Sequence, residues 1–432
     1  MNQLLIRVIA GLSLALAIPT LQAEDLNSAW REALASDPTL KASQSHIAAA
    51  QAELQVANAG RMPTVTASAG ISRFDEAPAF DFSAAGVPAV LPLFGGESMT
   101  MGDVRVSLPL YTGGQLSSGI RAAESMLNAQ QRGSAVSIQD IKLAVAAHYI
   151  NVLRAQTALE VADSSVASLV AHVRDVEDMF KSGSIARNDY LAAAVSLADS
   201  EQLRLQARNR LDLANAAYNR SLGRPLDAPV SLTGELPGID PDMNIESLDG
   251  LTHLALQSRD ELARLDAAAD VFRHQSQSVR ASTGPQFGLT GGYVALGNEF
   301  LNRDEFWMVG IGLQWDLFDG GQARKKARAL TFKAQAVREE SQYLRSMIEL
   351  QVRQAWLRLN ETTKRKQLTE RAVEQAQENL RVVRDRYRNG EGTNTEVLDA
   401  QVLRSKSRSN FDNADFDAKL ALYELARGVG RL

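Results

Sequence analysis

The stretch "LPLYTGGQ", residues 108–115, and its near-copy "WDLFDGGQ", residues 315–322, decide the fold of this chain. Each copy runs from strand-like residues through an aromatic residue and two glycines to a Gln that opens a polar, alanine-rich run. Glycine adopts backbone angles that other residues avoid, so such a pair suits a sharp change from strand to helix. The chain therefore makes the same strand-to-helix junction twice. The four junction glycines are Gly113, Gly114, Gly320 and Gly321.

The spacing of the two copies indicates an internal duplication. The glycine pairs lie 207 residues apart, and Gly183 and Gly390, in a second pair of similar turns, keep the same separation. Self-similarity at a fixed offset is the signature of a repeat. We therefore divide the chain into a first repeat, residues 24–235, and a second repeat, residues 246–432, with a Pro- and Gly-rich connector at residues 223–245.

Both repeats have the same order of predicted elements. The strand segments alternate apolar with small or polar residues, which is the pattern of a sheet with two unlike faces. Each strand has roughly nine to twelve residues, enough to cross a bilayer when tilted. The first hairpin holds an insertion at residues 76–102. The elements are an opening helix (26–59, 245–282), a β-hairpin (64–111, 286–317), a long helix (115–181, 322–389) and a return helix (188–222, 394–427).

The two long helices are the most unusual feature of the sequence. Each run has about 67 residues without proline, which corresponds to about 100 Å of helix. Apolar residues recur at alternating intervals of three and four, as at Val145, Val152 and Val166, and this heptad pattern predicts coiled-coil packing. His148 is the one polar member of the first stripe, and we expect a packed or lumen-edge histidine there rather than a metal ligand.

The N-terminal residues 1–23 resemble a secretory signal peptide. Arg7 precedes an apolar run at residues 8–18, and Leu21-Gln22-Ala23 forms a plausible cleavage site. The run is too short to span a bilayer as a helix, although a buried N-terminal helix would have the same composition. We therefore expect an exported chain.

The composition narrows the classes of function. The net charge is −5 with scattered Lys and Arg, so no basic face for nucleic acid is expected. The chain has no cysteine, which excludes disulfides and thiolate metal sites. Five dispersed histidines and the absence of nucleotide, zinc-protease or hydrolase motifs predict no metal, no cofactor and no enzymatic activity.

Four membrane-length strands cannot form a closed sheet within one chain. An open sheet edge in lipid leaves backbone groups unsatisfied at several kcal/mol each, and single-chain outer-membrane barrels have at least eight strands. If the strands enter a membrane, several chains must therefore share one barrel. Long helices projecting from that barrel would enclose a lumen, which suits a conduit better than a catalyst.

Together with the "YRNGEGTNTEVLDA" turn at residues 387–400, these features resemble the TolC-type outer-membrane efflux proteins. The resemblance implies a mainly α fold with a membrane β-barrel portion, made by a homotrimer whose 12-strand barrel joins a long α-helical coiled-coil barrel. It places the protein in the outer-membrane lipid of a Gram-negative bacterium, with its helices in the periplasm. It also implies two partners, a periplasmic adaptor and an inner-membrane pump that is proton-driven or of the ABC type.

The resemblance also implies where the conduit closes. Family members constrict the pore with carboxylates just after the second long helix, and the matching residues here are Glu396 and Asp399. Three chains would place six carboxylates in a narrow pore, which favours cations and resists anions. The function expected on this basis is an exit duct with a gate, for efflux or for type I secretion.

A latch and a docking surface are implied at the same end of the helices. The family's Tyr–Asp latch matches Tyr387 and Asp189, whereas Gly392 replaces its usual basic latch residue. The adaptor is expected to dock at the turns that contain Gly183 and Gly390. Two alternatives stay open at this stage, a soluble periplasmic coiled-coil adaptor or scaffold and, with no motif to support it, an exported enzyme.

Overall fold

The computed structural model describes residues 23–83, 86, 88–92, 97–239, 247–297 and 303–432. Nearly all of the predicted signal peptide, parts of the insertion and the end of the connector lie outside these residues. The chain divides into two compact units, each made of three segments. The first unit comprises Met1–Asp37, Ile141–Ile239 and Leu359–Tyr423, and the second comprises Pro38–Asp140, Asp240–Arg358 and Glu424–Leu432.

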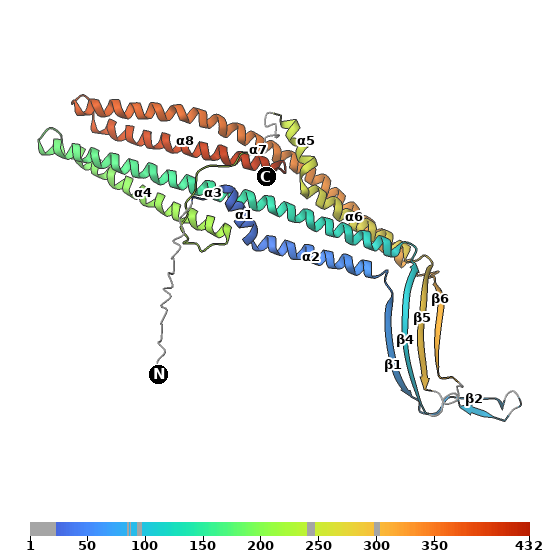
Figure 1. The fold of residues 1–432 in the computed structure, drawn as a ribbon. Coiled ribbons are helices and arrows are strands. Elements are labelled where there is room, and N and C mark those ends of the chain that lie inside the picture. The colour runs from blue at the N-terminus through green and yellow to red at the C-terminus, as the bar shows by residue number, and fades with distance from the viewer. Residues whose placement is uncertain (1–22, 84–85, 87, 93–96, 240–246, 298–302) are drawn as a thin grey trace, which may run out of the picture. The chain divides into compact units, whose positions relative to one another are not determined.

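The two repeats contain corresponding elements in the same order (Figure 1). The first repeat contains α1 (Leu26–Ser36), α2 (Pro38–Ala59), β1 (Thr64–Arg73), β2 (Ala79–Asp81), β3 (Val90–Pro92), β4 (Ser98–Tyr111), α3 (Gln115–Lys181) and α4 (Arg187–Leu222). The second contains α5 (Leu248–Ser258), α6 (Asp260–Ala281), β5 (Gln286–Gly297), β6 (Glu305–Gln314), α7 (Gln322–Arg388) and α8 (Asn394–Gly428). The short strands β2 and β3 belong to the insertion and have no counterpart in the second repeat.

The prediction of one continuous opening helix in each repeat was wrong. Pro38 separates α1 from α2, because proline lacks an N–H and keeps the preceding residue out of the helical region. Asp37 accordingly has ψ 122°. In the second repeat Arg259 makes the equivalent break with ψ 117°, and no proline is involved. The acidic residues Asp260 and Glu261 then begin α6, where they favour the positive end of the helix dipole.

The second unit contains a four-stranded antiparallel sheet in the order β1-β4-β5-β6. The pairing of β4 with β5 joins the hairpins of the two repeats into one sheet. Within the described residues, β1 and β6 each have one edge with no strand beside it. The sheet is therefore open on both sides in a single chain.

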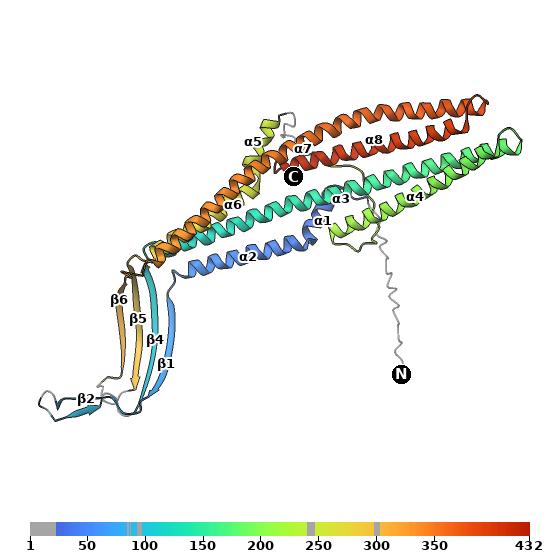
Figure 2. The same ribbon diagram turned by 180° about the vertical axis from the view of Figure 1, so that it is seen from behind.

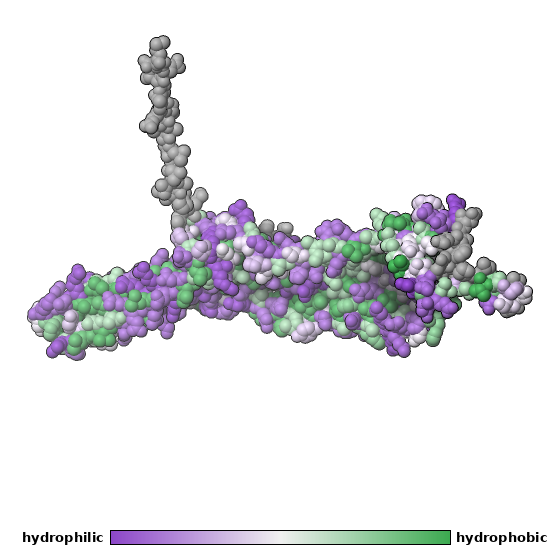
Figure 3. Space-filling model, turned by 90° about the horizontal axis from the view of Figure 1, so that it is seen from below, coloured by the Kyte–Doolittle hydropathy of each residue, from purple (hydrophilic) through white to green (hydrophobic). Residues whose placement is uncertain are grey.

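The two faces of this sheet differ in polarity. Residues paired across strands share a face, and one row reads Val65, Val106, Gly291 and Val309. The neighbouring row, on the other face, reads Thr66, Arg105, Gly292 and Met308. Val65 is 67% exposed and Val309 is 80% exposed, so no protein covers the apolar face. In Figure 3, hydrophobic and hydrophilic residues both reach the surface in the region of the strands.

The long helices α3 and α7 each have 67 residues, as predicted. In the first unit, α3 lies beside α4 and α7 lies beside α8 as two helical hairpins (Figure 2). The heptad stripe is confirmed at Val145, Val152 and Val176, which are at most 1% exposed. Among the described residues, no helix is both long enough and apolar enough to span a membrane.

Candidate functional site

The junction glycines occupy backbone positions that suit glycine. Gly113 and Gly114 have φ of 61° and 91°, and Gly320 and Gly321 have φ of 68° and 79°. In the second copy, the Asp319 carboxylate accepts hydrogen bonds from the N–H groups of Gly321 and Ala323, at 2.8 and 2.7 Å. Such bonds satisfy backbone donors that the first turn of a helix leaves unpaired. Each junction thus ends a strand and begins a capped helix.

The turns at the far ends of α3 and α7 close both helices in the same way. Gly183 and Gly390 have φ of 74° and 77°. In each turn the glycine N–H and the next N–H bond to carbonyls three and five residues earlier, which is a Schellman motif. A Cβ atom on either glycine would meet nothing within 4 Å. The backbone angle, rather than crowding, therefore explains the glycine, and the surface of both turns is open.

A small apolar core ties the two hairpins together near these turns. One buried residue comes from each of α3, α4, α7 and α8, and Ile185 and Tyr190 are among the partly buried residues packed around them. Such a core holds four helix ends in one arrangement through contacts that are local to the turns. We call it the tip cluster; it consists of Val176, Ala193, Tyr387 and Val397.

The tip cluster borders a buried histidine that the sequence analysis did not single out. His172 is 4% exposed, and its Nε2 lies 2.8 Å from Oδ1 of Asn394. The side-chain amide of Asn394 donates to the backbone carbonyl of Asp189 at 2.9 Å. Burial lowers the pKa of His172, the hydrogen bond to Asn394 opposes this shift, and the charge of Arg384 adds to it. The two hydrogen bonds of Asn394 link three helices, α3, α8 and α4.

A periodicity signal for His172 was present in the sequence. It lies three residues after Leu169 and four before Val176, so it shares a helix face with two buried positions. The strict heptad stripe contains His148 instead of His172, and the structure leaves His148 partly exposed.

The structure does not contain the Tyr387–Asp189 hydrogen bond that the family resemblance implies. Within the described residues, the buried Tyr387 hydroxyl has no hydrogen-bond partner. The Tyr387 ring packs into the tip cluster with its centroid 5.6 Å from that of His172. Burial, and then the nearby carboxylates of Asp189 and Asp175, raise the pKa of Tyr387. Beside Tyr387, His172 and Asn394 make a polar link between the hairpins.

Glu396 has a structural contact as well as an exposed position. Thr393 and Glu396 form a capping box at the start of α8, with the Thr393 hydroxyl accepting from the Glu396 N–H at 3.2 Å. The Glu396 carboxylate accepts in return from the Thr393 N–H at 3.4 Å and lies 3.8 Å from the Arg386 guanidinium. Asp399 is exposed one turn further along. The two carboxylates, three residues apart, lie on one side of α8.

Gly392 occupies a position where a longer side chain would crowd the turn. A Cβ atom there would lie 3.1 Å from the Tyr387 backbone nitrogen and 3.3 Å from the Glu396 carboxylate. Arg386 instead donates to the Glu391 carbonyl at 2.9 Å and faces Glu396. The positive charge in this turn therefore comes from α7.

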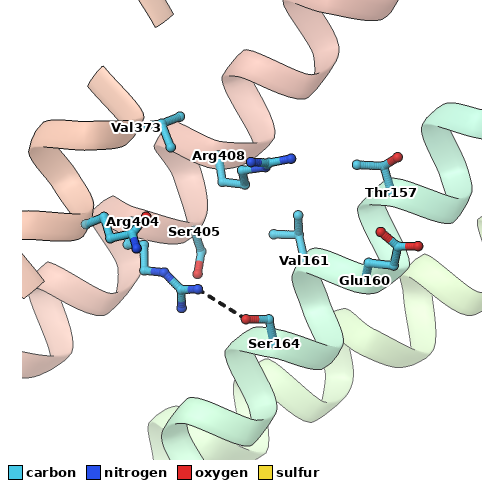
Figure 4. A pocket seen from close by; sticks show the side chains of 9 residues that line it. Thr157, Glu160, Val161, Ser164, Val373, Arg404, Ser405 and Arg408 are labelled. Atoms are coloured by element: carbon cyan, nitrogen blue, oxygen red, sulfur yellow. Dashed lines mark hydrogen bonds between the residues drawn. The ribbon is translucent and has the colours of Figure 1, made fainter. Parts of the chain in front are cut away.

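Further along the first unit, polar groups line the contact between the two hairpins. A cavity of about 260 Å³ lies there, and Figure 4 shows Arg404 and Arg408 of α8 reaching toward α3. Three serines of α3 make hydrogen bonds to the other hairpin beside it. We call these contacts the polar seam; they join Ser164 to Arg404, Ser165 to Ser405, and Ser168 to Arg384 and Gln401, at distances from 2.6 to 3.4 Å.

The polar seam differs from the interior of each hairpin. Its bonds between neutral side chains contribute about 0.5–1.5 kcal/mol each, and its bonds from Arg384 and Arg404 contribute about 1.5–3 kcal/mol each. The contact between the hairpins therefore combines hydrogen bonds, which water can replace, with the apolar tip cluster.

Comparison with known proteins matches the chain twice to one family, described as outer membrane efflux protein, over residues 29–224 and 251–431. Outer membrane protein TolC of Vibrio cholerae is 23% identical over 420 residues, which cover 95% of this chain and 91% of TolC. The efflux protein BepC of Brucella suis is 22% identical, covering 95% of this chain and 86% of BepC. The structure of the outer membrane protein VceC of Vibrio cholerae has a TM-score of 0.78 at 18% identity, covering 94% of this chain and 96% of VceC.

Proposed function

The chain belongs to the outer membrane efflux protein family, and we propose that it is the exit channel of a tripartite efflux or type I secretion system. Its place is the outer membrane. The single observation that supports the proposal best is the open four-stranded sheet with an uncovered apolar face, which continues directly into helices of 67 residues.

Aromatic pairs mark both ends of the apolar face. Tyr293 and Trp307 lie with ring centroids 5.0 Å apart near one end, and Tyr111 and Phe287 lie 6.1 Å apart near the other. Phe287 and Tyr293 are separated by six residues of β5, or about 20 Å of strand. Outer-membrane proteins present an apolar band about 25 Å tall between two aromatic girdles. The dimensions and residue types support insertion of the sheet in lipid.

A homotrimer would satisfy the two open edges of the sheet. Backbone groups at these edges need partners in lipid, and three copies would contribute twelve strands to one closed sheet.

The helices also have exposed apolar positions. On α7, three residues spaced seven apart are 68%, 46% and 53% exposed: Tyr343, Leu350 and Leu357. A heptad stripe of this kind is typical of contact with another helix. We infer that α7 packs against a neighbouring copy.

At the far ends of the helices we propose a gate formed by Glu396 and Asp399. Three chains would place six carboxylates around the opening, which favours cations. The capping box and Arg386 restrain the Glu396 carboxylate. We therefore expect Asp399 to be the more mobile of the two carboxylates. Tyr387 and Asp189 would act as a latch through packing and through the Asp189 carbonyl, which Asn394 holds.

The partners we propose are a periplasmic adaptor and an inner-membrane pump, proton-driven or of the ABC type. The turns at Gly183 and Gly390 would receive the adaptor, because their surfaces are open and rigidly capped. We propose no catalytic activity. Selection of the exported substrate would then belong to the pump.

Membrane fractionation followed by planar-bilayer recording tests the proposed function. We expect the protein in the outer-membrane fraction as a trimer that conducts ions after reconstitution. Recovery of the mature protein as a soluble periplasmic monomer, with no conductance after reconstitution, would overturn the proposal and favour a coiled-coil scaffold.

A further inference from the structure

The buried link at His172 ties three helices together next to the proposed gate. His172 lies on α3, and its partner Asn394 is the first residue of α8, two residues before Glu396. Asn394 also holds the Asp189 carbonyl in the first turn of α4. Asn394 is 4% exposed, like His172 itself. Loss of this link would remove one of the contacts that hold the start of α8, which carries both gate carboxylates, to the other hairpin.

The hydrogen bonds show which ring nitrogen carries a proton in either charge state. The Asn394 amide nitrogen donates to a carbonyl, so its oxygen faces His172 and must accept from Nε2–H. Burial favours the neutral ring, with Nδ1 unprotonated. A proton added at Nδ1 would leave the Nε2–H bond in place, but it would create a charge on a ring that is 4% exposed, which is unfavourable.

Charged groups on the surrounding helices do not compensate for such a charge. From α7, Arg388 pairs with Asp175 of α3 at 3.0 Å, and Arg384, which donates to the polar seam, adds positive charge. Tyr387 of α7 contributes a neutral ring. From α4, Asp189 offers its carbonyl to Asn394, and from α8 the facing group is the neutral Asn394.

We propose that His172 is a pH-sensitive joint that holds the gate shut when neutral and releases it when protonated. The inference rests on the proposed function, since it concerns the same gate. It differs from a role of the carboxylate rings, because acid acts here on the joint between the hairpins and not on the pore lining. An acidic periplasm would then favour the open state.

The direction of the effect follows from linkage. Burial lowers the pKa of His172 in the closed state, so the closed state is fully stabilised above the ordinary histidine pKa of about 6.5 and loses stability as the pH falls below it. Within that window, each pH unit shifts the closed-to-open equilibrium by up to about tenfold. Between pH 7.5 and pH 5.5 we therefore expect a several-fold rise in open probability.

Two measurements on the full-length trimer test this joint. The first is planar-bilayer conductance between pH 7.5 and pH 5.5. The second is the separation of spin labels at Ser182 and Glu391, exposed residues in the two turns. The chain has no native cysteine, so introduced labels are unique. Labelled chains are diluted into unlabelled trimers so that distances within one chain dominate.

His172→Gln keeps an N–H donor for Asn394 and cannot titrate, so both pH responses should be lost. The matched control is His148→Gln, a partly exposed histidine of the same helix, which should keep the wild-type response. Asn394→Asp places a carboxylate beside the ring, and acid should then no longer loosen the joint.

The outcomes distinguish the joint from the rings and from the channel itself. A response that persists in His172→Gln, or that vanishes in the double variant Glu396→Gln with Asp399→Asn, would overturn the proposal. An unchanged label separation in wild type between pH 7.5 and pH 5.5 would also overturn it. Absence of conductance at every pH would refute the proposed channel, while the label distances would still report on His172.

Discussion

Replacement of Glu261 by Gln tests a buried ion-pair network in the second unit. Glu261 accepts hydrogen bonds from Arg259 and Arg427, each at 2.7 Å. The three side chains are 13%, 8% and 10% exposed, respectively. Burial alone would raise the pKa of Glu261, but the two guanidinium groups outweigh it and lower the pKa from 4.5 to about 2. The network joins the break at Arg259 to the end of α8.

The size of the effect follows from that shift. A difference of about 2.5 pKa units corresponds to about 3 kcal/mol of folding free energy at neutral pH. Loss of one partner from a buried ion pair typically costs about 3–5 kcal/mol, which agrees. For 432 residues the unfolding entropy is about 0.9 kcal/mol/K, so the variant should unfold about 3 °C lower.

Asp140→Asn is the matched control, because Asp140 contacts the same Arg427 at 2.7 Å but is 59% exposed. Exposed pairs contribute about 0–1 kcal/mol, so the melting temperature of the control should fall by about 1 °C or less. The assay is thermal unfolding of the detergent-solubilised protein followed by circular dichroism at pH 7. A fall for Glu261→Gln no larger than that of the control would refute the reasoning.

The pH dependence gives an independent check on Glu261. Because its pKa is lowered in the folded state, its contribution is complete above pH 4.5 and is lost as the pH falls toward 2. The difference in melting temperature between wild type and Glu261→Gln should therefore narrow by about half or more between pH 7 and pH 3. A constant difference would assign the effect to packing.

Three further predictions concern the sheet and the gate. Val309→Arg should lower outer-membrane recovery, because a cation facing lipid costs about 2–4 kcal/mol, whereas Ser107→Arg, at similar depth on the opposite face, should not. Tyr387→Phe should leave the conductance within about twofold of wild type, because the buried hydroxyl has no hydrogen bond in the described chain. A large rise in conductance would instead support a latch formed by the hydroxyl. Glu396→Gln combined with Asp399→Asn should weaken block by divalent cations, and unchanged block in bilayer recordings would reject the ring assignment.

The long helices were predicted to within one residue because their limits are local. A glycine pair starts each one and a positive-φ glycine follows its end, so the run of helix-forming residues between them shows where the helix lies. Strand limits were predicted less well. β4 begins at Ser98, inside the insertion predicted at residues 76–102, since the end of that insertion continues the same alternation.

Features that depend on contacts far apart in sequence were not predictable. The break at Arg259 has no proline or glycine to mark it, and Arg259 donates a hydrogen bond there to Gln351, 92 residues away. The link between His172 and Asn394 joins residues 222 positions apart. The periodicity of α3 shows that His172 faces inward, but it does not show which helix supplies its partner.

The distribution of apolar and polar contacts in the first unit determines which movement opens the gate most easily. Within each hairpin, buried aliphatic and aromatic residues interlock, and separation would expose apolar surface at about 25 cal/mol/Å². Between the hairpins, the hydrogen bonds of the polar seam can be exchanged for bonds to water, at about 0.5–3 kcal/mol each. The tip cluster of four buried residues, the neutral His172 beside it and the Arg388–Asp175 ion pair also hold the hairpins together. A gate that opens and closes needs states of similar free energy, and we expect protonation of His172 to shift that balance toward the open state.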